Sequence, residues 1–429
     1  MRTLLISIEI NGKQVHVGDI TYQNPADAGF QYAEEYRNRQ GAAPISISLP
    51  FQNERFSPER TRIFFEGLLP EGFIRSSVAD WLHIDQDDYL SILAGLGSEC
   101  LGAVKVIDEE ATHTEAHYEK LETWQVADLA KEGAAKSVQL VTKSHLSLTG
   151  ASAKVGLYFD AKNQQWYLPI GEAPSTHIVK QSHIRLGGIV TNEQLCLLTA
   201  RQLGIETPES FIIDVGTSED GDVLFATRRY DRMMKQETTK IDCLDQPLRL
   251  HQEDFAQALG RASSEKYENA GQGYLKAMFD LLKSYSANPV EDRLKLWDII
   301  VFDYLIGNTD NHIKNYSLLY NEDLKKIRLA PAYDIVSTAV YDSSTRDMGI
   351  AIDGKLSLSE ITPNSFKEEA KNIGLGTKIA MERFDQMRER FLPALNQSTE
   401  FLKKEGFYKS EDIRKSILLN GGIANLQKC

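Results

Sequence analysis

The sequence lacks three features that mark common classes of protein. Its four cysteines, Cys100, Cys196, Cys243 and Cys429, have no C-x-x-C spacing, which argues against a disulfide framework or a zinc knuckle. The net charge of -13 argues against a general nucleic-acid coat and against an anionic-membrane binder, because both need positive surface charge. No apolar run has transmembrane length, and the first one is too short for a signal peptide. We therefore expect a cytoplasmic protein with reduced thiols and no membrane contact.

The first part of the 429-residue chain predicts a small α+β subdomain, residues 1–107. Alternating apolar and polar residues flank Asn11-Gly12, which is a strong hairpin signal. Further strands are expected over 44–50 ("PISISLP") and 101–107 ("LGAVKVI"), with a helix over 60–82 between them.

Residues 108–245 predict a sheet-rich lobe, and residues 246–429 predict a mostly helical lobe. An acidic run over 108–120 is typical of a linker. Beyond it we expect strands over 145–159, 164–170, 176–181, 210–215 and 223–232, and a helix over 191–205 that Thr191 or Asn192 opens and Gly204 closes. Helical periodicity then dominates, as in 274–285 and 293–307.

The stretch "TDNHIKN" follows an apolar helical pattern and holds the first chemical signal. Asp310 and Asn315 have the spacing of a kinase catalytic loop, where Asp accepts the proton of the substrate hydroxyl and Asn binds Mg²⁺. Downstream, "LAPAYDIVS" supplies Asp334, a second hard oxygen ligand for such a metal. Taken singly, the first stretch fits an ordinary polar turn better than a catalytic loop, and Asp334 fits a residue that caps or closes a turn.

Three upstream signals are weak alone. Lys180 ends the strand "THIVK" and could reach an ATP phosphate, while Glu193 on the next helix could pair with it. The small residues of "SLTGASAK", 147–154, would let backbone N–H groups approach phosphate oxygens, although no Walker A pattern is present. A strand-edge lysine, an exposed helix-start glutamate and a plain turn are the structural alternatives. The order of all these signals is that of a two-lobed kinase.

The same residues resemble the HipA-type serine/threonine kinase toxins over nearly the whole chain. The segments that carry the resemblance are "SLTGASAK", "THIVK", "NEQLCLLTARQLGI", "TRRYDR", "GNTDNHIKNYSLL" and "LAPAYDIVS", with "ISLPF", "FFEGLLPE" and "GLGSECLGAV" before them. The resemblance implies an α+β, two-lobed protein-kinase-like fold. Its sheet-rich N-terminal lobe would carry the extra α+β subdomain, and its C-terminal lobe would be mostly helical.

The resemblance also implies roles for individual residues. Asp310 would be the catalytic base, and Asn315 and Asp334 the Mg²⁺ ligands. Lys180 would contact the ATP phosphates and Ser147 would be autophosphorylated, with Thr149 as the second candidate. The other residues of the nucleotide site would be the phosphate loop Thr149, Gly150, Ala151, Ser152, Ala153 and Lys154, the adenine border Arg228, Arg229 and Tyr230, and the lining residues His312, Ile313, Lys314 and Tyr333.

The implied function is that of a toxin kinase in a toxin–antitoxin pair. A small DNA-binding antitoxin would restrain it, DNA would be contacted only through that antitoxin, and the protein substrate of the family is an aminoacyl-tRNA synthetase. Two alternatives stay open. One is a catalytically weak co-repressor that grips the antitoxin, and the other is a kinase for a small metabolite.

Overall fold

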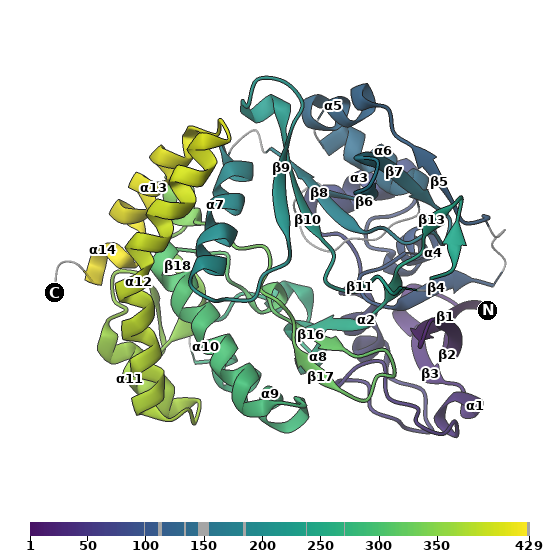
Figure 1. The fold of residues 1–429 in the computed structure, drawn as a ribbon. Coiled ribbons are helices and arrows are strands. Elements are labelled where there is room, and N and C mark those ends of the chain that lie inside the picture. The colour runs from purple at the N-terminus through teal and green to yellow at the C-terminus, as the bar shows by residue number, and fades with distance from the viewer. Residues whose placement is uncertain are drawn as a thin grey trace. The chain divides into compact units, whose positions relative to one another are not determined.

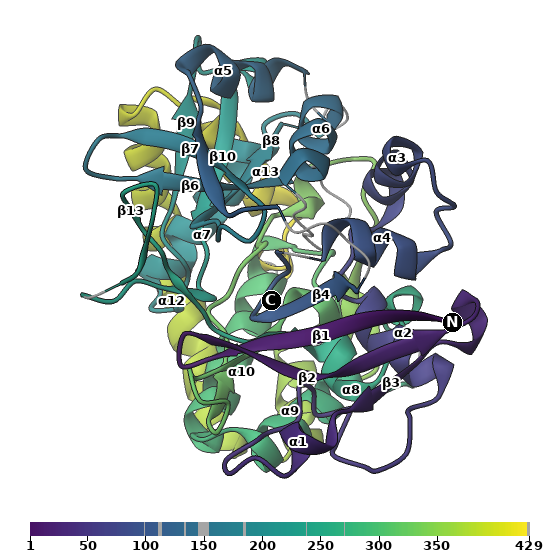
Figure 2. The same cartoon turned by 90° about the vertical axis from the view of Figure 1, so that its right-hand side faces the viewer.

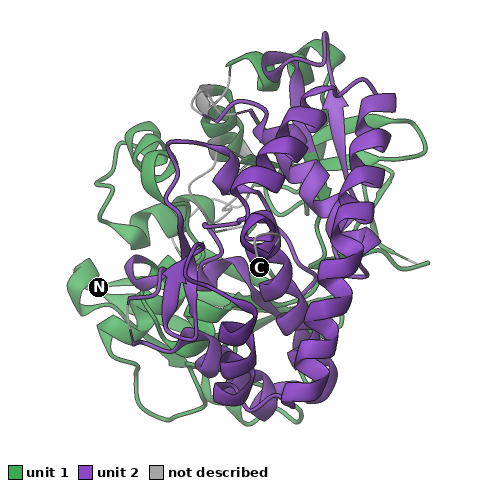
Figure 3. Ribbon diagram, turned by 90° about the vertical axis from the view of Figure 1, so that its left-hand side faces the viewer, with its two compact units in different colours: residues 1–181, 226–263, 319–327 green, residues 182–225, 264–318, 328–429 purple. Residues whose placement is uncertain are grey.

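The computed structural model describes residues 1–97, 99–109, 114–132, 134–144, 154–182, 186–236, 238–269 and 271–426, and Figure 1 shows its elements. The chain forms two compact units, each built from separate segments, which Figure 3 colours. Unit 1 contains residues 1–181, 226–263 and 319–327, and unit 2 contains residues 182–225, 264–318 and 328–429. Each unit therefore combines segments that are far apart in the sequence.

Unit 1 begins with an antiparallel sheet of order β3-β2-β1-β4, visible in Figure 2. Its strands are β1 (Arg2–Ile10), β2 (Lys13–Tyr22), β3 (Gly29–Tyr32) and β4 (Val104–Asp108). Asn11 and Gly12 have φ values of 50° and 76°, so the predicted hairpin turn is confirmed. Strand β4 confirms the strand expected over 101–107. Alternate residues of β1, Leu4, Ile6 and Ile8, are fully buried, as a sheet with one covered face requires.

Two expectations for the first 107 residues are wrong. Residues 44–50 form no strand, because the Glu253 carboxylate accepts hydrogen bonds from the Ser46 hydroxyl at 2.5 Å and the Ile47 amide at 3.1 Å, which fixes the segment as a loop. The helix expected over 60–82 is two helices, α2 (Pro58–Glu66) and α3 (Gly72–Leu82). The break lies just before Gly72, whose φ is 54°. The short α1 (Glu34–Arg37) and α4 (Tyr89–Leu96) complete this part.

The second sheet of unit 1 has the neighbouring strands β5, β7, β6 and β8 in that order. They are β5 (His117–Lys120), β6 (Lys154–Asp160), β7 (Gln165–Ile170) and β8 (His177–Gln181). The linker expected over 108–120 is partly wrong, since β5 pairs with β7 at the sheet edge. The strand expected over 145–159 is found from Lys154 onward, and its earlier residues lie outside the described ones. Helices α5 (Thr123–Glu132) and α6 (Ala134–Ser144) were not expected, and α6 packs on β6 and β7.

Short elements complete unit 1 after residue 226. Strand β10 (Val223–Arg228) lies next to β8, and its residues from Ala226 onward belong to this unit. The remaining elements are η1 (Pro25–Asp27), β11 (Arg232–Met233), β12 (Lys240–Ile241), β13 (Leu244–Asp245), β14 (Leu248–Arg249), β15 (Gln252–Asp254) and α8 (Phe255–Leu259). β16 (Ser317–Tyr320) and β17 (Ile327–Leu329) each contain a crossing of the chain from one unit to the other.

Unit 2 is mostly helical, as expected for the later part of the chain. Its helices are α7 (Ile189–Gln202), α9 (Tyr274–Tyr285), α10 (Pro289–Ile306), α11 (Pro363–Asn372), α12 (Thr377–Lys404), α13 (Lys409–Asn420) and α14 (Ile423–Leu426). The short elements are β9 (Ser210–Asp214), β18 (Asp347–Ile352), β19 (Lys355–Ser357), η2 (Asp220–Asp222), η4 (Ile313–Asn315) and η5 (Thr338–Val340), while η3 (Ser263–Glu265) begins in unit 1. The helices expected over 274–285 and 293–307 are confirmed.

Helix α7 starts earlier than expected. Thr191 and Asn192 do not open it, because Gly188, with φ of 72°, is the N-cap residue and both polar residues are buried within the first turns. The expected end is confirmed by Gly204, whose φ is 87° just after the C-cap. The Asn192 side chain is used for tertiary contacts and is therefore unavailable as a cap.

Aromatic packing fixes α10 against the C-terminal helices of unit 2, which Figure 1 shows side by side. The Trp297 indole N–H donates to the Ala380 carbonyl at 3.0 Å, and its ring packs edge-on against Phe366. Phe302 contacts Phe391, with ring centroids 6.2 Å apart. The helix that precedes the "TDNHIKN" stretch is therefore held firmly before the stretch begins.

In the part of the chain that the structure describes, no helix has the length and apolar character that a membrane crossing requires.

Candidate active site

The candidate loop starts where α10 ends at Gly307, whose φ is 71°. A buried carboxylate, Asp303, holds the two sides of the loop together. Its Oδ1 accepts from the Asn308 side-chain amide at 2.9 Å, and its Oδ2 accepts from the Tyr316 hydroxyl at 2.6 Å. Burial raises the pKa of Asp303 to about 7, although these two hydrogen bonds lower it. Asp303 thus holds the loop at both of its ends, Asn308 and Tyr316.

Asp310 lies at the exposed top of this loop. Its amide donates to the Asn308 side-chain oxygen at 3.2 Å, and its carbonyl accepts from the His312 amide at 2.8 Å. The Tyr267 hydroxyl donates to Asp310 Oδ1. His312 Nε2 is 3.9 Å from the same oxygen. The side chain of Asp310 is 53% exposed, so a substrate group can reach it.

Asn315 turns its side chain back onto the loop. Its amide nitrogen donates to the Asp310 carbonyl at 2.7 Å, which fixes the orientation of the side-chain oxygen. Tyr333 approaches the same turn, because its hydroxyl donates to the Lys314 carbonyl at 3.0 Å. The structure therefore brings Asp310, Asn315, Lys314 and Tyr333 together within unit 2.

Asp334 follows Tyr333 in the left-handed conformation, with φ of 56°. Aspartate tolerates this region better than most residues, but it is uncommon and often occurs at functional sites. The next residues are anchored to α7, since the Asn192 side chain accepts from the Ser337 amide at 3.1 Å and donates to the Ser337 carbonyl at 2.9 Å. Ser337 in turn donates to the Ile306 carbonyl at 2.5 Å. The Asp334 segment is thereby tied to the end of α10.

The candidate residues of unit 1 include two lysines that lie side by side on neighbouring strands. Lys154 and Lys180 are directly paired in the antiparallel register of β6 and β8. Directly opposed residues share one face, with Cβ atoms about 4.5–5.5 Å apart, so the two cationic side chains lie on the same face of the sheet. Residues 147–153, which contain the expected phosphate loop, lie outside the described ones, so that loop and the sites Ser147 and Thr149 stay predictions.

Among the residues expected to border adenine, Arg229 has a side chain that is used in buried ion pairs. The guanidinium is fully buried and contacts Asp231 at 2.7 Å and Glu99 at 3.2 Å. Its amide donates to the Thr176 carbonyl at 2.8 Å. Arg228 is exposed, and the Tyr230 hydroxyl donates to Gln252. The side chain of Arg229 is therefore not available to face a base. The expected pairing of Lys180 with Glu193 involves both units and stays a prediction.

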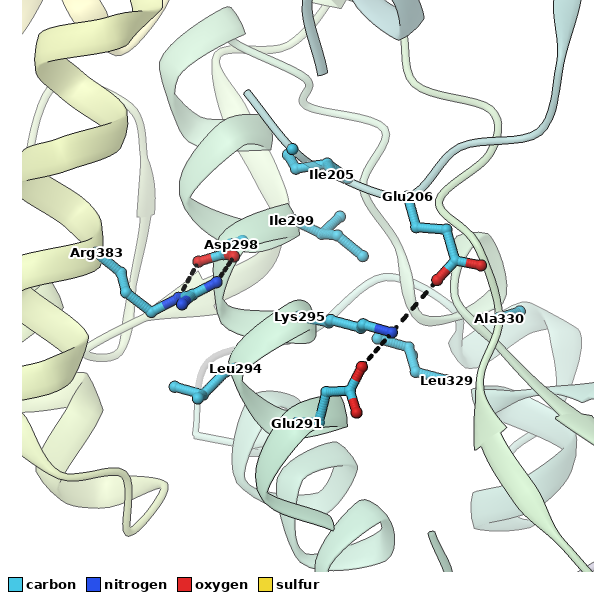
Figure 4. Close-up of a pocket in the computed structure, with 11 residues that line it drawn as sticks. Ile205, Glu206, Glu291, Leu294, Lys295, Asp298, Ile299, Leu329, Ala330 and Arg383 are labelled. Carbon is cyan, nitrogen blue, oxygen red and sulfur yellow. Dashed lines mark hydrogen bonds and ion pairs between the residues drawn. The ribbon is translucent and has the colours of Figure 1, made fainter. Parts of the chain in front are cut away.

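A cavity of about 280 Å³ lies elsewhere in unit 2, and Figure 4 shows its lining. Lys295 lies between the carboxylates of Glu206 and Glu291, at 3.3 Å and 2.8 Å, while Arg383 binds Asp298 with two hydrogen bonds. The charges of these side chains are thus mutually paired, and none of the candidate site residues lines the cavity. The cavity is therefore distinct from the loop that carries Asp310.

The side chains of Asn315 and Asp334 are of types that fit a hard cation. An amide oxygen of fixed orientation on Asn315 and the carboxylate of Asp334 are the donor types that Mg²⁺ prefers, and Mg²⁺ usually takes its other ligands from water and substrate phosphates. Within the described ranges, no group of three or more His, Cys, Asp and Glu side chains forms a metal cage. A cation held partly by a nucleotide needs no such cage.

Sequence reasoning missed the residues that support the loop from outside it. Tyr267 contacts Asp310 from 43 positions away. Gly349 donates its amide to the Asn311 side-chain oxygen at 2.7 Å, and an added Cβ at Gly349 would lie 2.8 Å from the His312 amide nitrogen. No local pattern distinguishes these residues, because their roles depend on contacts that are distant in sequence.

The α+β fold is that of a protein-kinase-like enzyme. So is a loop that carries an exposed aspartate and, five positions later, an asparagine. Two family models match the chain, the HipA N-terminal domain over residues 8–107 and the HipA-like C-terminal domain over residues 146–395. The second covers more than half of the 429 residues, and the chain therefore belongs to the HipA family.

Curated relatives agree with this assignment. Y4mE of Sinorhizobium fredii, described as a candidate kinase, is 32% identical over 86% of this chain and 86% of its own. The serine/threonine-protein kinase toxin HipA of Shewanella oneidensis is 24% identical over 91% of this chain and 88% of its own. Among solved structures, HipA from the Shewanella oneidensis complex of HipA, HipB and operator DNA has a TM-score of 0.78 at 20% identity, covering 99% of this chain and 97% of that one. The expected kinase-like α+β fold is confirmed, and the protein is a kinase.

Proposed function

We propose that this protein is an ATP- and Mg²⁺-dependent serine/threonine protein kinase that acts as the toxin of a toxin–antitoxin pair. The observation that carries the proposal is the loop itself. Asp310 is half exposed at its top, the Asn315 amide is bound to the Asp310 carbonyl, and a buried carboxylate fastens the loop from below. Positioning and electrostatics account for most of the catalysis in phosphoryl transfer, so a rigid loop of this composition suits that chemistry.

The reaction would proceed with Asp310 as the base. A serine or threonine hydroxyl of the substrate attacks the γ-phosphorus of ATP, its proton passes to the Asp310 carboxylate, and the bond to the β–γ bridging oxygen breaks to release ADP. Asn315 and Asp334 would hold Mg²⁺, which neutralises the charge on the phosphate oxygens when it is bound. Lys154 and Lys180 would bind phosphate oxygens, because both are cationic and share one face of the sheet.

The remaining proposed assignments concern the residues that would bind the nucleotide. The backbone of Arg228 to Tyr230 would border the adenine, and His312, Ile313 and Lys314 would line the remaining nucleotide site with Tyr333. The phosphate loop, residues 149–154, would cover the phosphates. Family membership supports these proposed roles.

The test is transfer of label from γ-labelled ATP with Mg²⁺. The wild type should label itself or an acceptor protein, and Asp310→Ala should lower the rate at least about a hundredfold, since a general base contributes that much or more. Asp385→Ala is the matched control, because Asp385 on α12 is 51% exposed against 53% for Asp310. Equal labelling by wild type and Asp310→Ala would refute the assignment of the base.

The partners proposed are a small DNA-binding antitoxin and a protein substrate, with an aminoacyl-tRNA synthetase as the target class. The HipA structure with HipB and operator DNA supports the antitoxin partner. Expression without the antitoxin should stop growth in the wild type and not in Asp310→Ala. Growth arrest that persists in Asp310→Ala would favour a co-repressor that acts without catalysis.

Autophosphorylation of Ser147, with Thr149 as the second candidate, is the proposed control. A phosphate adds nearly two negative charges beside the nucleotide phosphates, so repulsion should displace the loop. Intact-mass analysis should find one phosphate on the wild type and none on Asp310→Ala, and peptide mapping should choose between the two hydroxyls. Unmodified wild-type protein after incubation with ATP and Mg²⁺ would contradict this proposal.

A further inference from the structure

The contact between Tyr267 and Asp310 is the strongest feature that the proposed function leaves unexplained. The Tyr267 hydroxyl donates to Asp310 Oδ1, although both side chains are about half exposed. Exposed side chains rarely keep one geometry without additional support. The surroundings of Tyr267 supply that support.

The residues on both sides of Tyr267 are bound to the site. The carbonyl of Lys266 accepts from the Ile313 amide at 3.2 Å, and the amide of Glu268 donates to the Gly349 carbonyl at 2.9 Å. The tyrosine backbone is thus fixed between the loop that carries Asp310 and strand β18.

The Glu268 side chain strengthens this attachment. One of its carboxylate oxygens accepts from the amides of Gly273 and Tyr274 at 2.7 Å and 3.1 Å, and the other accepts from the Ala351 amide at 2.8 Å. Hydrogen bonds to a buried carboxylate are among the stronger ones in proteins. The start of α9 and strand β18 therefore hold the segment that presents Tyr267.

The ring of Tyr267 is placed as firmly as its backbone. It packs edge-on against His312, with centroids 5.0 Å apart and planes at 82°. The Lys266 ammonium lies 5.5 Å from the ring centroid. The hydroxyl therefore reaches Asp310 from a fixed direction.

We propose that Tyr267 is a positioning residue that fixes the orientation of the Asp310 carboxylate for phosphoryl transfer, an inference that rests on the proposed function. The terminal torsion of an aspartate is broad, so a half-exposed carboxylate rotates unless a donor holds it. An ionised carboxylate accepts on both oxygens. With Oδ1 bound to Tyr267, the plane of the carboxylate is held for the hydroxyl of the substrate.

The test is Tyr267→Phe, which keeps the ring against His312 and removes only the hydroxyl. Steady-state transfer from MgATP to dephosphorylated casein should show kcat lowered about tenfold, because loss of alignment costs that order of magnitude. The KM for MgATP should stay within about twofold, since alignment of the base does not affect nucleotide binding. Tyr285→Phe, a half-exposed tyrosine at the end of α9, should behave as the wild type.

Each other outcome has a definite meaning. An unchanged kcat in Tyr267→Phe would show that the hydroxyl has no part in transfer. A raised kcat, or a lowered KM for casein, would show that the hydroxyl competes with the acceptor, which overturns the proposal. Absence of label on both the wild-type protein itself and casein would refute the proposed function, whereas an active wild type with an equally active Tyr267→Phe refutes only this inference.

A measurement without catalysis checks the contact itself. In protein labelled with 3-fluorotyrosine, the ¹⁹F resonance that is missing from Tyr267→Phe should shift in Asp310→Ala and not in Asp385→Ala. A resonance that ignores the loss of Asp310 would overturn the proposal.

Discussion

Replacing Glu99 by Gln tests the buried ionic cluster that holds unit 1 together. Glu99 is 1% exposed and contacts three guanidinium groups, those of Arg232 and Arg249 at 2.7 Å and of Arg229 at 3.2 Å. Burial raises the pKa of Glu99, but the guanidinium charges outweigh burial and hold the pKa well below its ordinary value. The carboxylate therefore stays ionised in the folded protein.

The expected loss of stability in Glu99→Gln follows from the charges that remain in the cluster. Asp231 and Glu9 supply the other negative charges, at 2.7 Å from Arg229 and 3.4 Å from Arg249. Glu99→Gln leaves three buried cations against two anions. Leaving one buried charge without its partner costs about 3–5 kcal/mol. Glu206→Gln, whose partner Lys295 is partly exposed, should cost less than about 1 kcal/mol.

Hydrogen–deuterium exchange of peptides that cover 99–108 and 223–233 reports the local loss of stability. These peptides should lose protection in Glu99→Gln and keep it in Glu206→Gln. The double variant Glu99→Gln/Arg232→Gln restores the charge balance, so it should be less destabilised than the sum of the single variants by about 1–3 kcal/mol. Strict additivity of the two substitutions, or a Glu99→Gln variant as stable as the wild type, would refute the reasoning.

Three further predictions concern the site. Asp303→Asn should flatten the pH dependence of stability, which denaturation at pH 5, 6 and 7 checks. The folded pKa of about 7 lies above the ordinary 3.8. In the wild type, this group therefore lowers the free energy of unfolding by up to about 1.4 kcal/mol per pH unit as pH rises from 4 to 7. Lys180→Met should raise the KM for MgATP about tenfold or more through the loss of a charged contact, whereas Lys162→Met, on an exposed turn, should not. Asn315→Ala should raise the Mg²⁺ concentration for half-maximal transfer about tenfold, measured at saturating ATP.

Local signals explain the parts of the fold that were predictable. The Asn11-Gly12 turn needs only two residues with positive φ, and both are residues that tolerate it. Helix α9 keeps its periodic apolar residues on one buried face, and α10 ends at a glycine in the left-handed conformation. These features depend on neighbours in the sequence, so the sequence alone indicates them.

Contacts over long sequence distances explain the errors. The segment 44–50 has the pattern of a strand, but a carboxylate more than 200 positions away fixes it as a loop. The resemblance assigns Arg229 to the adenine border, and only the structure shows that Glu99, 130 positions earlier, binds its guanidinium in the interior. Propensity and pattern carry no information about such partners.

The candidate loop was predictable because its residues lie close together in the sequence, and its support was not. Asp310 and Asn315 are five positions apart, and this spacing together with the order of the other signals indicates the loop. The hydroxyl that reaches Asp310 from Tyr267 comes from a segment with no distinguishing pattern. A candidate site can thus be located from the residues proposed to do the chemistry, while the residues that contact them from distant segments require the fold.

Two carboxylates seven positions apart show how the fold divides the work of this loop. Asp303 is buried, its pKa is raised to about 7, and both of its oxygens are occupied by Asn308 and Tyr316. Asp310 is half exposed at the top of the same loop. Environments that differ this much assign different roles to chemically identical groups. Asp303 is suited to holding the loop, because its hydrogen bonds are sheltered from water, and Asp310 is suited to meeting a substrate, because its side chain is accessible to one.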